Sequence, residues 1–190
     1  HPMTREEFLA EVIRAGAVGI NFEDGTFEGD EPLHPLDFQC ERIQAVRKAA
    51  DTEGLPLVIN ARVDVFIRQV PGSEAERTAE TIKRAKAYLD AGADCIYPIA
   101  MGDIDVLKQI HSEIKAPINV YASASAASMQ DLEANGISRL SLGPNFMLAS
   151  LATMKKIAQH LQNYGAYDLF TEEMIPFGEM GRYISKDSMP

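Results

Sequence analysis

Short apolar runs alternate with amphipathic segments along most of the chain. The runs are rich in β-branched residues, as buried parallel strands are, and the segments between them repeat apolar residues at helical spacing. The runs predict five strands, at residues 17–23, 55–61, 95–99, 118–121 and 138–142. The segments after them predict helices at residues 38–52, 73–92, 103–114, 128–135 and 144–164. This alternation predicts a parallel α/β fold.

The chain opens on a predicted helix that has no strand before it. Thr4 and Glu7 form a capping box at its start, and Gly16 ends it. Ser73 and Glu76 form a second capping box, at the start of the helix whose inward face is predicted to hold Ile82, Ala85 and Leu89. A complete (β/α)8 barrel takes about 200 to 250 residues. Two interpretations remain, an open doubly wound sheet or the later part of a barrel whose first three strands are missing, and the leading helix favours the second.

Charge and cysteine content narrow the class of partner. The 190 residues include 28 acidic and 18 basic residues, for a formal net charge of -10 at pH 7. This balance argues against nucleic acid or an anionic membrane as a partner, since both attract clustered Lys and Arg. No apolar run reaches the ~20 residues that span a bilayer. The two cysteines, Cys40 and Cys95, fit a reducing compartment, and we expect a cytoplasmic protein.

Charged side chains follow the first two predicted strands directly. Residues 19–24 end in Glu23 and Asp24, and residues 58–64 end in a segment that holds Arg62 and Asp64. Ligands bind at the carboxyl ends of parallel strands, in barrels and in open sheets. We therefore expect groups from two strands to meet at one site, which suggests an enzyme.

Five segments, in this order, resemble the isocitrate lyase and phosphoenolpyruvate mutase superfamily, in particular its mutase-like branch. They are Ala-Gly-Ala-Val-Gly-Ile-Asn-Phe-Glu-Asp at 15–24, Pro-Leu-Val-Ile-Asn-Ala-Arg-Val-Asp at 56–64, Ala-Gly-Ala-Asp-Cys-Ile-Tyr at 91–97, Pro-Ile-Asn-Val at 117–120 and Leu-Ser-Leu-Gly-Pro at 140–144. The resemblance implies a TIM-type (β/α)8 barrel, N-terminally incomplete in this chain, over residues 1–165. Residues 166–190 would form a C-terminal helix and tail, of the kind that this family exchanges with a neighbouring subunit.

The same resemblance implies an activity. Members of the superfamily bind Mg²⁺ and make or break a C–C or P–C bond in a small 2-oxo or enol carboxylate. A homodimer or homotetramer is expected as well. The family's main metal-binding aspartates would lie upstream of His1 on this alignment.

The resemblance also assigns roles to the strand-end residues. Glu23 matches the carboxylate that reaches Mg²⁺ through water, although it could be an ordinary strand-end charge. Arg62 matches the arginine that binds the substrate's carboxylate or phosphonate. Arginine suits this role, because its planar fork donates two parallel hydrogen bonds to such a group. Arg62 could also pair with Asp64 or Glu23, and both interpretations can hold together. Asp24 is expected to order the following loop or to cap backbone groups. The other predicted substrate-binding residues are Asn60, Asn119 and Tyr121.

The polar stretch at residues 25–37 occupies the position of the family's gating loop. Isocitrate and methylisocitrate lyases carry Lys-Arg-Cys-Gly-His there, with the Cys as catalytic acid, and mutases and phosphonopyruvate hydrolases use a Lys and an Asn. This chain reads Gly-Thr-Phe-Glu-Gly-Asp-Glu-Pro-Leu-His-Pro-Leu, with no Lys, Cys or Asn. The two lyase activities are therefore disfavoured. The titratable candidates that remain in the loop are Asp30, Glu31 and His34.

These observations lead to one hypothesis and two rivals. The leading hypothesis is a Mg²⁺-dependent lyase or mutase that acts on a substrate like phosphonopyruvate, phosphoenolpyruvate or oxaloacetate through an enolate-like intermediate. The alternative is a non-catalytic or truncated relative that binds a small acid and folds by oligomerisation. A Schiff-base aldolase is discounted, because no strand end carries Lys. Self-association is predicted from an apolar set near the C-terminus: Met174, Ile175, Phe177, Met180 and Tyr183.

Overall fold

The computed structural model describes residues 11–26, 29–170 and 174–184. The predicted capping box at Thr4 and Glu7 lies outside these residues. The chain divides into two compact units, His1–Gly143 and Pro144–Pro190. The predicted boundary at residue 165, between a barrel domain and a C-terminal helix and tail, stays a prediction. Within the described ranges, we find no helix whose length and apolarity would let it cross a membrane.

The first unit is built on parallel strands. In the described residues these are β1 (Gly19–Glu23), β2 (Val58–Val63), β3 (Cys95–Pro98), β4 (Asn119–Tyr121) and β5 (Arg139–Ser141). The first three form one parallel sheet in chain order, and β4 pairs with β5 in a second parallel sheet. A parallel bridge between Ile96 and Ile118 connects the two sheets in sequence order. The five predicted strands and their parallel α/β class are confirmed.

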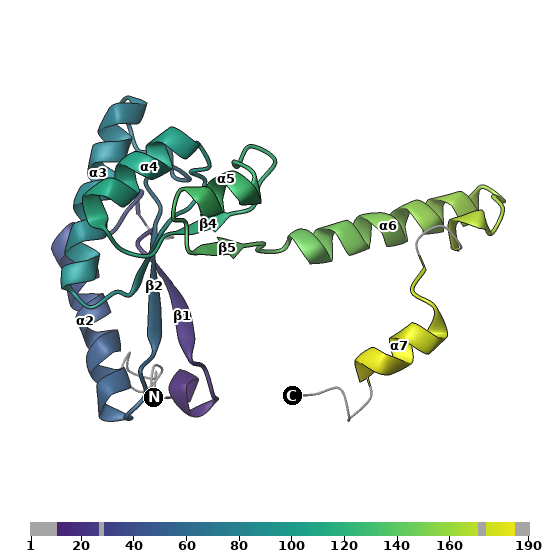
Figure 1. Cartoon of the computed structure of the whole chain (residues 1–190), viewed down its shortest axis with the longest axis horizontal. Helices are drawn as coiled ribbons and strands as arrows, with labels where there is room; N and C mark the ends of the chain where they lie inside the picture. Colours follow the sequence, from purple (N-terminus) through teal and green to yellow (C-terminus); the bar gives the residue numbers. More distant parts are fainter. Residues whose placement is uncertain (1–10, 27–28, 171–173, 185–190) are drawn as a thin grey trace. The chain divides into compact units, whose positions relative to one another are not determined.

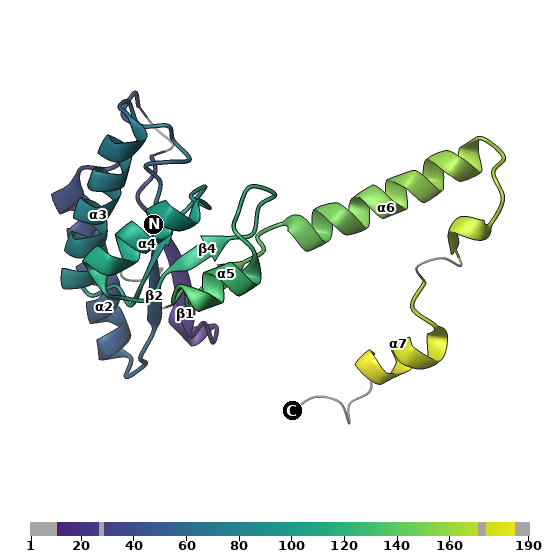
Figure 2. The same cartoon turned by 45° about the horizontal axis from the view of Figure 1, so that its top comes forward.

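Helices follow the strands as the hydropathy pattern predicts. They are α2 (Leu36–Thr52), α3 (Glu74–Asp90), α4 (Ile104–Ile114) and α5 (Met129–Ala134). Figures 1 and 2 show α2 and α3 along the same side of β1 and β2. Because each helix returns the chain to the amino end of the next strand, the carboxyl ends of all the strands share one edge.

The capping box predicted at Ser73 and Glu76 is confirmed at the start of α3. The Ser73 hydroxyl accepts a hydrogen bond from the Glu76 N–H at 3.2 Å, and the Glu76 carboxylate accepts one from the Ser73 N–H at 2.7 Å. The predicted inward face is confirmed, since Ala85 is buried and the half-buried Ile82 and Leu89 pack against the apolar clusters. The other buried residues of α3 are Thr78, Thr81, Arg84 and Tyr88. Polar side chains therefore make up much of the buried face of this helix.

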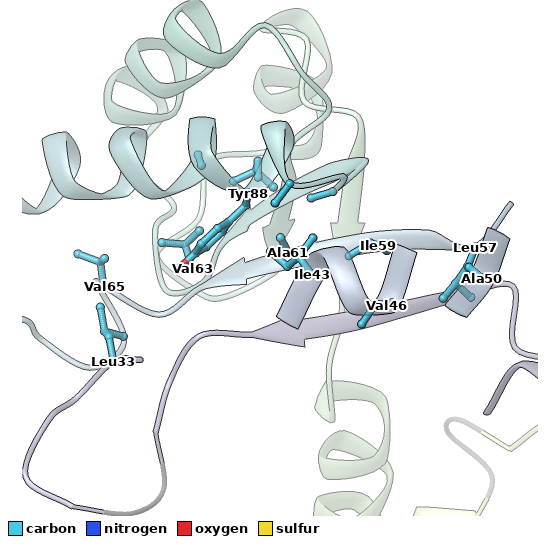
Figure 3. Packing of buried hydrophobic residues seen from close by; sticks show 14 of the residues in the cluster. Leu33, Ile43, Val46, Ala50, Leu57, Ile59, Ala61, Val63, Val65 and Tyr88 are labelled. Carbon is cyan, nitrogen blue, oxygen red and sulfur yellow. The ribbon is translucent and has the colours of Figure 1, made fainter. Parts of the chain in front are cut away.

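The two faces of β2 differ sharply. Ile59, Ala61 and Val63 are fully buried and pack against residues of α2 and α3, including Ile43 and Tyr88 (Figure 3). Since side chains alternate along a strand, the residues between them point to the opposite face. The sheet therefore has an apolar face under the helices and a polar face on the other side.

This alternation corrects the predicted bounds of the second strand. The strand was expected at 55–61, with Arg62 beyond its end, but β2 runs from Val58 to Val63 and contains Arg62. A charged residue can lie inside this strand because it points to the polar face. The expectation that such strands are buried on both faces is also wrong for β1, whose Gly19 and Asn21 are exposed.

Strand register sets the order of the polar face. Glu23 of β1 is level with Arg62 of β2, and Arg62 is level with Tyr97 of β3. Two residues earlier, Asn21 is level with Asn60. The polar face thus carries one row of residues at the strand ends and a second row directly below it.

The second unit contains helices only, among the residues described. They are α6 (Asn145–Gln162), a short 3-10 helix (Asp168–Phe170) and α7 (Phe177–Ile184). No residue of α6 is buried, and its exposed apolar residues include Phe146, Met147, Leu148, Leu151 and Met154. The predicted helix at residues 144–164 is confirmed with slightly narrower bounds.

Candidate active site

Arg62 lies at the centre of the strand-end groups. Its Nε donates a hydrogen bond to Asp64 Oδ1 at 2.7 Å, and its Nη2 donates to Asp64 Oδ2 at 2.8 Å. Nη2 also pairs with the Glu23 carboxylate. The Asp64 side chain is fully buried, whereas the side chains of Arg62 and Glu23 keep 23% and 30% of their surface exposed. The hydrogen bonds that Arg62 donates to Asp64 raise the pKa of Arg62 further above its already high ordinary value. Both predicted pairings of Arg62 therefore hold, and part of the guanidinium is accessible.

Asp24 orders the backbone behind this pair, as predicted. Its Oδ1 accepts a hydrogen bond from the Asp64 N–H at 2.8 Å. Its Oδ2 accepts hydrogen bonds from the Tyr88 hydroxyl at 2.6 Å and from Arg84 Nη1 at 3.2 Å. Burial raises the pKa of Asp24 against the effect of these donors. Asp24 has no exposed surface, so its function is to support the site from within.

Helix α2 holds the end of β1 in place. The carbonyl oxygen of Glu23 accepts hydrogen bonds from Gln39 Nε2 at 3.2 Å and Arg42 Nη1 at 3.3 Å. The Arg42 guanidinium also lies over the Phe22 ring, 4.6 Å from its centroid. Sequence reasoning did not identify these supports. Their signal would have been two polar residues on the inward side of an otherwise amphipathic helix.

An asparagine pair lies one row below Arg62. Asn60 Nδ2 donates a hydrogen bond to Asn21 Oδ1 at 2.7 Å. Asn60 is only 4% exposed, and its Oδ1 has no hydrogen-bond partner among the residues that the structure describes. A buried carbonyl oxygen normally has a donor, because leaving it unpaired costs free energy. Asn60 can therefore accept one more hydrogen bond from a group outside these residues.

The ends of β3, β4 and β5 carry a second polar cluster. Asn119 Nδ2 donates to the Ser141 hydroxyl at 3.0 Å, and Ser141 also bonds to Tyr97. Burial raises the pKa of Tyr97, while the positive charge of Arg62 opposes this shift, which places Tyr97 within electrostatic reach of Arg62. Tyr121 of β4 has the opposite effect to Arg62 and raises the pKa of Tyr97, so it too lies within electrostatic reach of this ring. Asn119 and Tyr121 thus approach the Arg62 site through Tyr97, a residue that sequence reasoning missed. Tyr97 is recognised only from the strand register, which places it level with Arg62.

The loop after β1 is fastened at both ends. Gly25 and Leu33 form an antiparallel bridge, and the His34 N–H donates to the Asp24 carbonyl at 2.8 Å. The His34 ring meets Phe38 edge-on, with centroids 5.3 Å apart. Asp30 is exposed. The loop base is therefore joined to the strand-end site.

The middle of the loop has different neighbours. Glu31 is exposed and lines a cavity of about 300 Å³ together with Arg77 and Glu80 of α3. The Glu31 carbonyl oxygen also accepts a hydrogen bond from the Thr26 hydroxyl, within the loop itself. Among the three predicted loop residues, His34 is bonded to the site through its backbone, since its N–H donates to Asp24 and its carbonyl accepts from Arg84.

The strand-end carboxylates can supply one contact to a metal ion. The described residues do not supply the remaining ligands of a metal site. Within residues 11–26, 29–170 and 174–184, no group of three or more His, Cys, Asp and Glu is placed to hold a metal. Asp24 and Asp64 are buried and hydrogen-bonded, which leaves Glu23 as the accessible carboxylate. Mg²⁺ keeps several waters and takes few direct carboxylates, so a contact with Glu23 through water is reasonable. Further oxygen ligands would be needed.

Comparison with known proteins agrees with this geometry. A family model described as phosphoenolpyruvate phosphomutase matches residues 1–162. The 2-methylisocitrate lyase of Escherichia coli (strain K12) is 28% identical over 160 residues, which cover 80% of this chain and 50% of the relative. The phosphoenolpyruvate phosphomutase of Streptomyces hygroscopicus is 27% identical over 191 residues, which cover 93% of this chain and 58% of the relative. The chain therefore spans about half the length of the curated relatives it matches.

Solved structures show the same fold. A provisionally named lyase/mutase from Burkholderia cenocepacia J2315 superposes with a TM-score of 0.86 at 28% sequence identity, covering 97% of this chain and 66% of that chain. A 2,3-dimethylmalate lyase, a member of the PEP mutase/isocitrate lyase superfamily, superposes with a TM-score of 0.76 at 19% identity. The superposition covers 96% of this chain and 63% of the 2,3-dimethylmalate lyase chain. At 19% identity, it supports a similarity of fold and nothing more.

Proposed function

Because the chain belongs to the phosphoenolpyruvate phosphomutase family, we propose that it carries part of the active site of a Mg²⁺-dependent lyase or mutase. The substrate would be a small 2-oxo or enol carboxylate, like phosphonopyruvate, phosphoenolpyruvate or oxaloacetate. The observation that carries the proposal is Arg62, partly exposed at the carboxyl edge of the sheet and held there by a fully buried carboxylate. A guanidinium fixed in this way is suited to bind an anionic group.

Arg62 would hold the carboxylate or phosphonate of the substrate. Its Nε and Nη2 are occupied by Asp64 and Glu23, whereas Nη1 makes no hydrogen bond in the described part of the chain. As the C–C or P–C bond breaks, negative charge develops on the oxygens of an enolate-like intermediate. The positive charge of Arg62, fixed before the substrate arrives, stabilises that charge without reorganisation.

The polar neighbours would orient the substrate. Asn60 offers an unpaired buried oxygen that can accept a hydrogen bond from a substrate hydroxyl or from an ordered water. Asn119 and Tyr121, the first and last residues of β4, would contact the other end of a small acid. Bound Mg²⁺ would supply additional positive charge near the reacting oxygens. Glu23 would hold it through water, and the remaining oxygen ligands would come from outside the described residues.

The loop at residues 25–37 would close over the substrate and exclude water. Asp30, Glu31 and His34 are its titratable members, and one of them would move a proton if the loop supplies the general acid or base. The similarity to the Escherichia coli 2-methylisocitrate lyase covers 80% of this chain, but this loop lacks the Cys and Lys that the resemblance assigns to such lyases. The loop also lacks the Lys and Asn that the resemblance assigns to mutases and phosphonopyruvate hydrolases. Its sequence therefore argues against an isocitrate-type lyase without selecting among the other activities.

We also propose self-association into a homodimer or homotetramer. Helix α7 and the residues before it expose Met174, Ile175, Phe177, Met180 and Tyr183, with Phe177 92% exposed. A second copy of the chain offers the same apolar groups and would remove them from water. Light scattering coupled to size-exclusion chromatography tests this, and a monomer at all concentrations would contradict it.

Turnover of phosphonopyruvate, oxaloacetate and 2-methylisocitrate with Mg²⁺ tests the assignment. Arg62→Ala should abolish turnover of the true substrate, because nothing else among the described strand-end residues carries an accessible positive charge in that row. Arg47→Ala is the matched control, since Arg47 pairs with Asp94 near the amino end of β3. Full activity of Arg62→Ala would refute the proposal.

The alternative is a non-catalytic relative that binds a small acid. The loop composition favours it, since the loop holds neither Cys nor Lys. Calorimetric binding of phosphonopyruvate or oxalate without turnover of any candidate acid would support this second function.

A further inference from the structure

Helix α3 directs two polar side chains toward the strand-end site. Arg84 and Tyr88 lie one helical turn apart on the same face, and both are buried. Arg84 Nη1 donates a hydrogen bond to the Tyr88 hydroxyl at 3.0 Å. The Tyr88 hydroxyl donates to Asp24 Oδ2 at 2.6 Å, and Arg84 Nη1 reaches the same oxygen at 3.2 Å. Two donors from one helix therefore converge on one carboxylate oxygen.

The other side of Asp24 faces β2. Its Oδ1 accepts a hydrogen bond from the Asp64 N–H at 2.8 Å, and its own N–H donates to the Arg62 carbonyl at 3.2 Å. These two bonds join Asp24 to the backbone on both sides of Val63. They extend the contact between the two chain segments by one residue beyond the last paired residues of β1 and β2. The Asp64 carboxylate then grips the Arg62 guanidinium with two bonds of 2.7 and 2.8 Å. A continuous series of contacts runs from α3 to Arg62.

We propose that Tyr88 and Arg84 are positioning residues that set the orientation of the Arg62 guanidinium through Asp24 and Asp64. The inference rests on the role proposed above for Arg62, namely that it holds the acid group of the substrate. An arginine side chain has many rotamers, and immobilising it on binding costs free energy. Because Asp64 is itself fixed from behind, Arg62 is ordered before the ligand binds.

Tyr88 allows a sharp test because its ring and its hydroxyl have separate roles. The ring packs in the apolar cluster with Ile43, Ala61 and Val63 (Figure 3), whereas the hydroxyl makes the bond to Asp24. Tyr88→Phe keeps the packing and removes one donor. Arg84 is less specific, since its Nη1 also donates to the His34 carbonyl at the end of the loop, at 3.1 Å. Arg84→Lys serves as a second variant that keeps the charge and loses the fork.

The first readout needs no substrate. The Arg62 Nε–H signal in a ¹⁵N NMR spectrum, assigned by its loss in Arg62→Lys, reports how firmly the guanidinium is held. In Tyr88→Phe we expect faster hydrogen exchange and larger-amplitude motion at Arg62 Nε. The Arg47 Nε–H, which donates to the Gly92 carbonyl at 3.2 Å near the amino end of β3, should not change. An unchanged Arg62 signal, or an equal change at Arg47, would overturn the proposal.

The second readout uses the turnover assay described above. For Tyr88→Phe we expect KM for the acid to rise about tenfold, the lower limit when outer-shell partners of a site are removed, with a much smaller change in kcat. Arg47→Lys, a destabilising change remote from Arg62, should leave KM unaltered. An unaltered KM in Tyr88→Phe, or a matching rise in Arg47→Lys, would count against positioning. If the native protein turns over none of the acids, the proposed function fails, and the NMR measurement still decides the positioning role.

Discussion

The contact between Arg62 and Asp64 makes a sharp prediction about both stability and binding. Asp64→Asn keeps the shape of the side chain but replaces one carboxylate oxygen with an NH₂ group. That group would face a guanidinium N–H, so two donors would oppose each other where 2.7 and 2.8 Å bonds now exist. The substitution also removes a fully buried negative charge that Arg68 approaches at 3.7 Å.

The expected loss of stability follows from the exposure of the two partners. Removing one member of a buried ion pair costs about 3 to 5 kcal/mol, and a single charge-assisted hydrogen bond contributes about 1.5 to 3 kcal/mol. Asp64 is fully buried, but Arg62 keeps 23% of its side chain exposed and retains Glu23 as a partner. Water and Glu23 therefore recover part of the loss. We expect about 2 to 3 kcal/mol of destabilisation.

Urea denaturation of four proteins measures this energy: the native chain, Asp64→Asn, Arg62→Met and the double variant. If the pair causes the loss, the two substitutions should be non-additive, with a coupling of about 2 kcal/mol. Asp94→Asn is the control, since Asp94 binds Arg47 and the Ile59 N–H near the opposite end of β2. Asp94→Asn should lower stability without changing the KM for the acid, whereas Asp64→Asn should change both. An additive cycle, or a normal KM in Asp64→Asn, would refute the reasoning.

Three further predictions concern the loop, the core and the start of α3. Gly25→Ala should weaken acid binding, because a Cβ there would clash with the Asp64 carboxylate and lie 3.0 Å from the Arg68 side chain; calorimetry with phosphonopyruvate, with Gly54→Ala as an exposed comparison, measures this. Ile43→Ala should lower the free energy of unfolding by about 2 to 5 kcal/mol, since Ile43 is fully buried on α2 in the cluster that includes the β2 residues, and a loss below about 0.5 kcal/mol in urea denaturation, the scale of a surface change, would contradict the packing. The Ser73 N–H lowers the pKa of Glu76 below its ordinary value of 4.5, so the capping box stabilises the chain fully above that pH and loses its effect as the pH falls through the lowered value. The stability difference between the native chain and Glu76→Gln should therefore shrink as the pH falls below 4.5, and a difference that grows on acidification would show the sign to be wrong.

The hydropathy pattern was sufficient to predict the strands and their order. β-Branched runs of the right length read as buried strands whichever helices cover them, and the capping box at Ser73 is a purely local signal. The position of Arg62 inside β2 was not predictable from the run alone, because a charge normally marks the end of an apolar segment. Asn60 and Arg62 point to one face of the strand, and the apolar residues beside them point to the other. Only this alternation of faces shows that the strand continues.

The supports of the site were beyond sequence reasoning for a different reason. Asp24 bonds to Tyr88 across 64 positions, and Asn119 bonds to Ser141 across 22. The first pair depends on how α3 lies on the sheet and the second on the register of β4 and β5, and a single sequence specifies neither. Arg84 lies in an amphipathic helix, and an arginine there is normally predicted to be a surface residue. Nothing in the local sequence indicates that it pairs with a buried carboxylate. The loop residue Glu31 was expected near the site because the resemblance places residues 25–37 at the gating loop. In the structure it lines a cavity together with residues of α3.

The fastening of the loop after β1 has a practical consequence. Its base is closed by the Gly25–Leu33 bridge and by the His34 N–H on the Asp24 carbonyl, so backbone groups hold the two ends together. The residues between these anchors can then be replaced as a cassette. If the loop closes over a substrate as proposed above, grafting the loop of a relative between positions 26 and 32 should alter which acids bind, while Arg62 stays held by Asp64 and Glu23 beneath it. On that proposal, a change of substrate range requires only loop exchange and leaves the strand ends as they are.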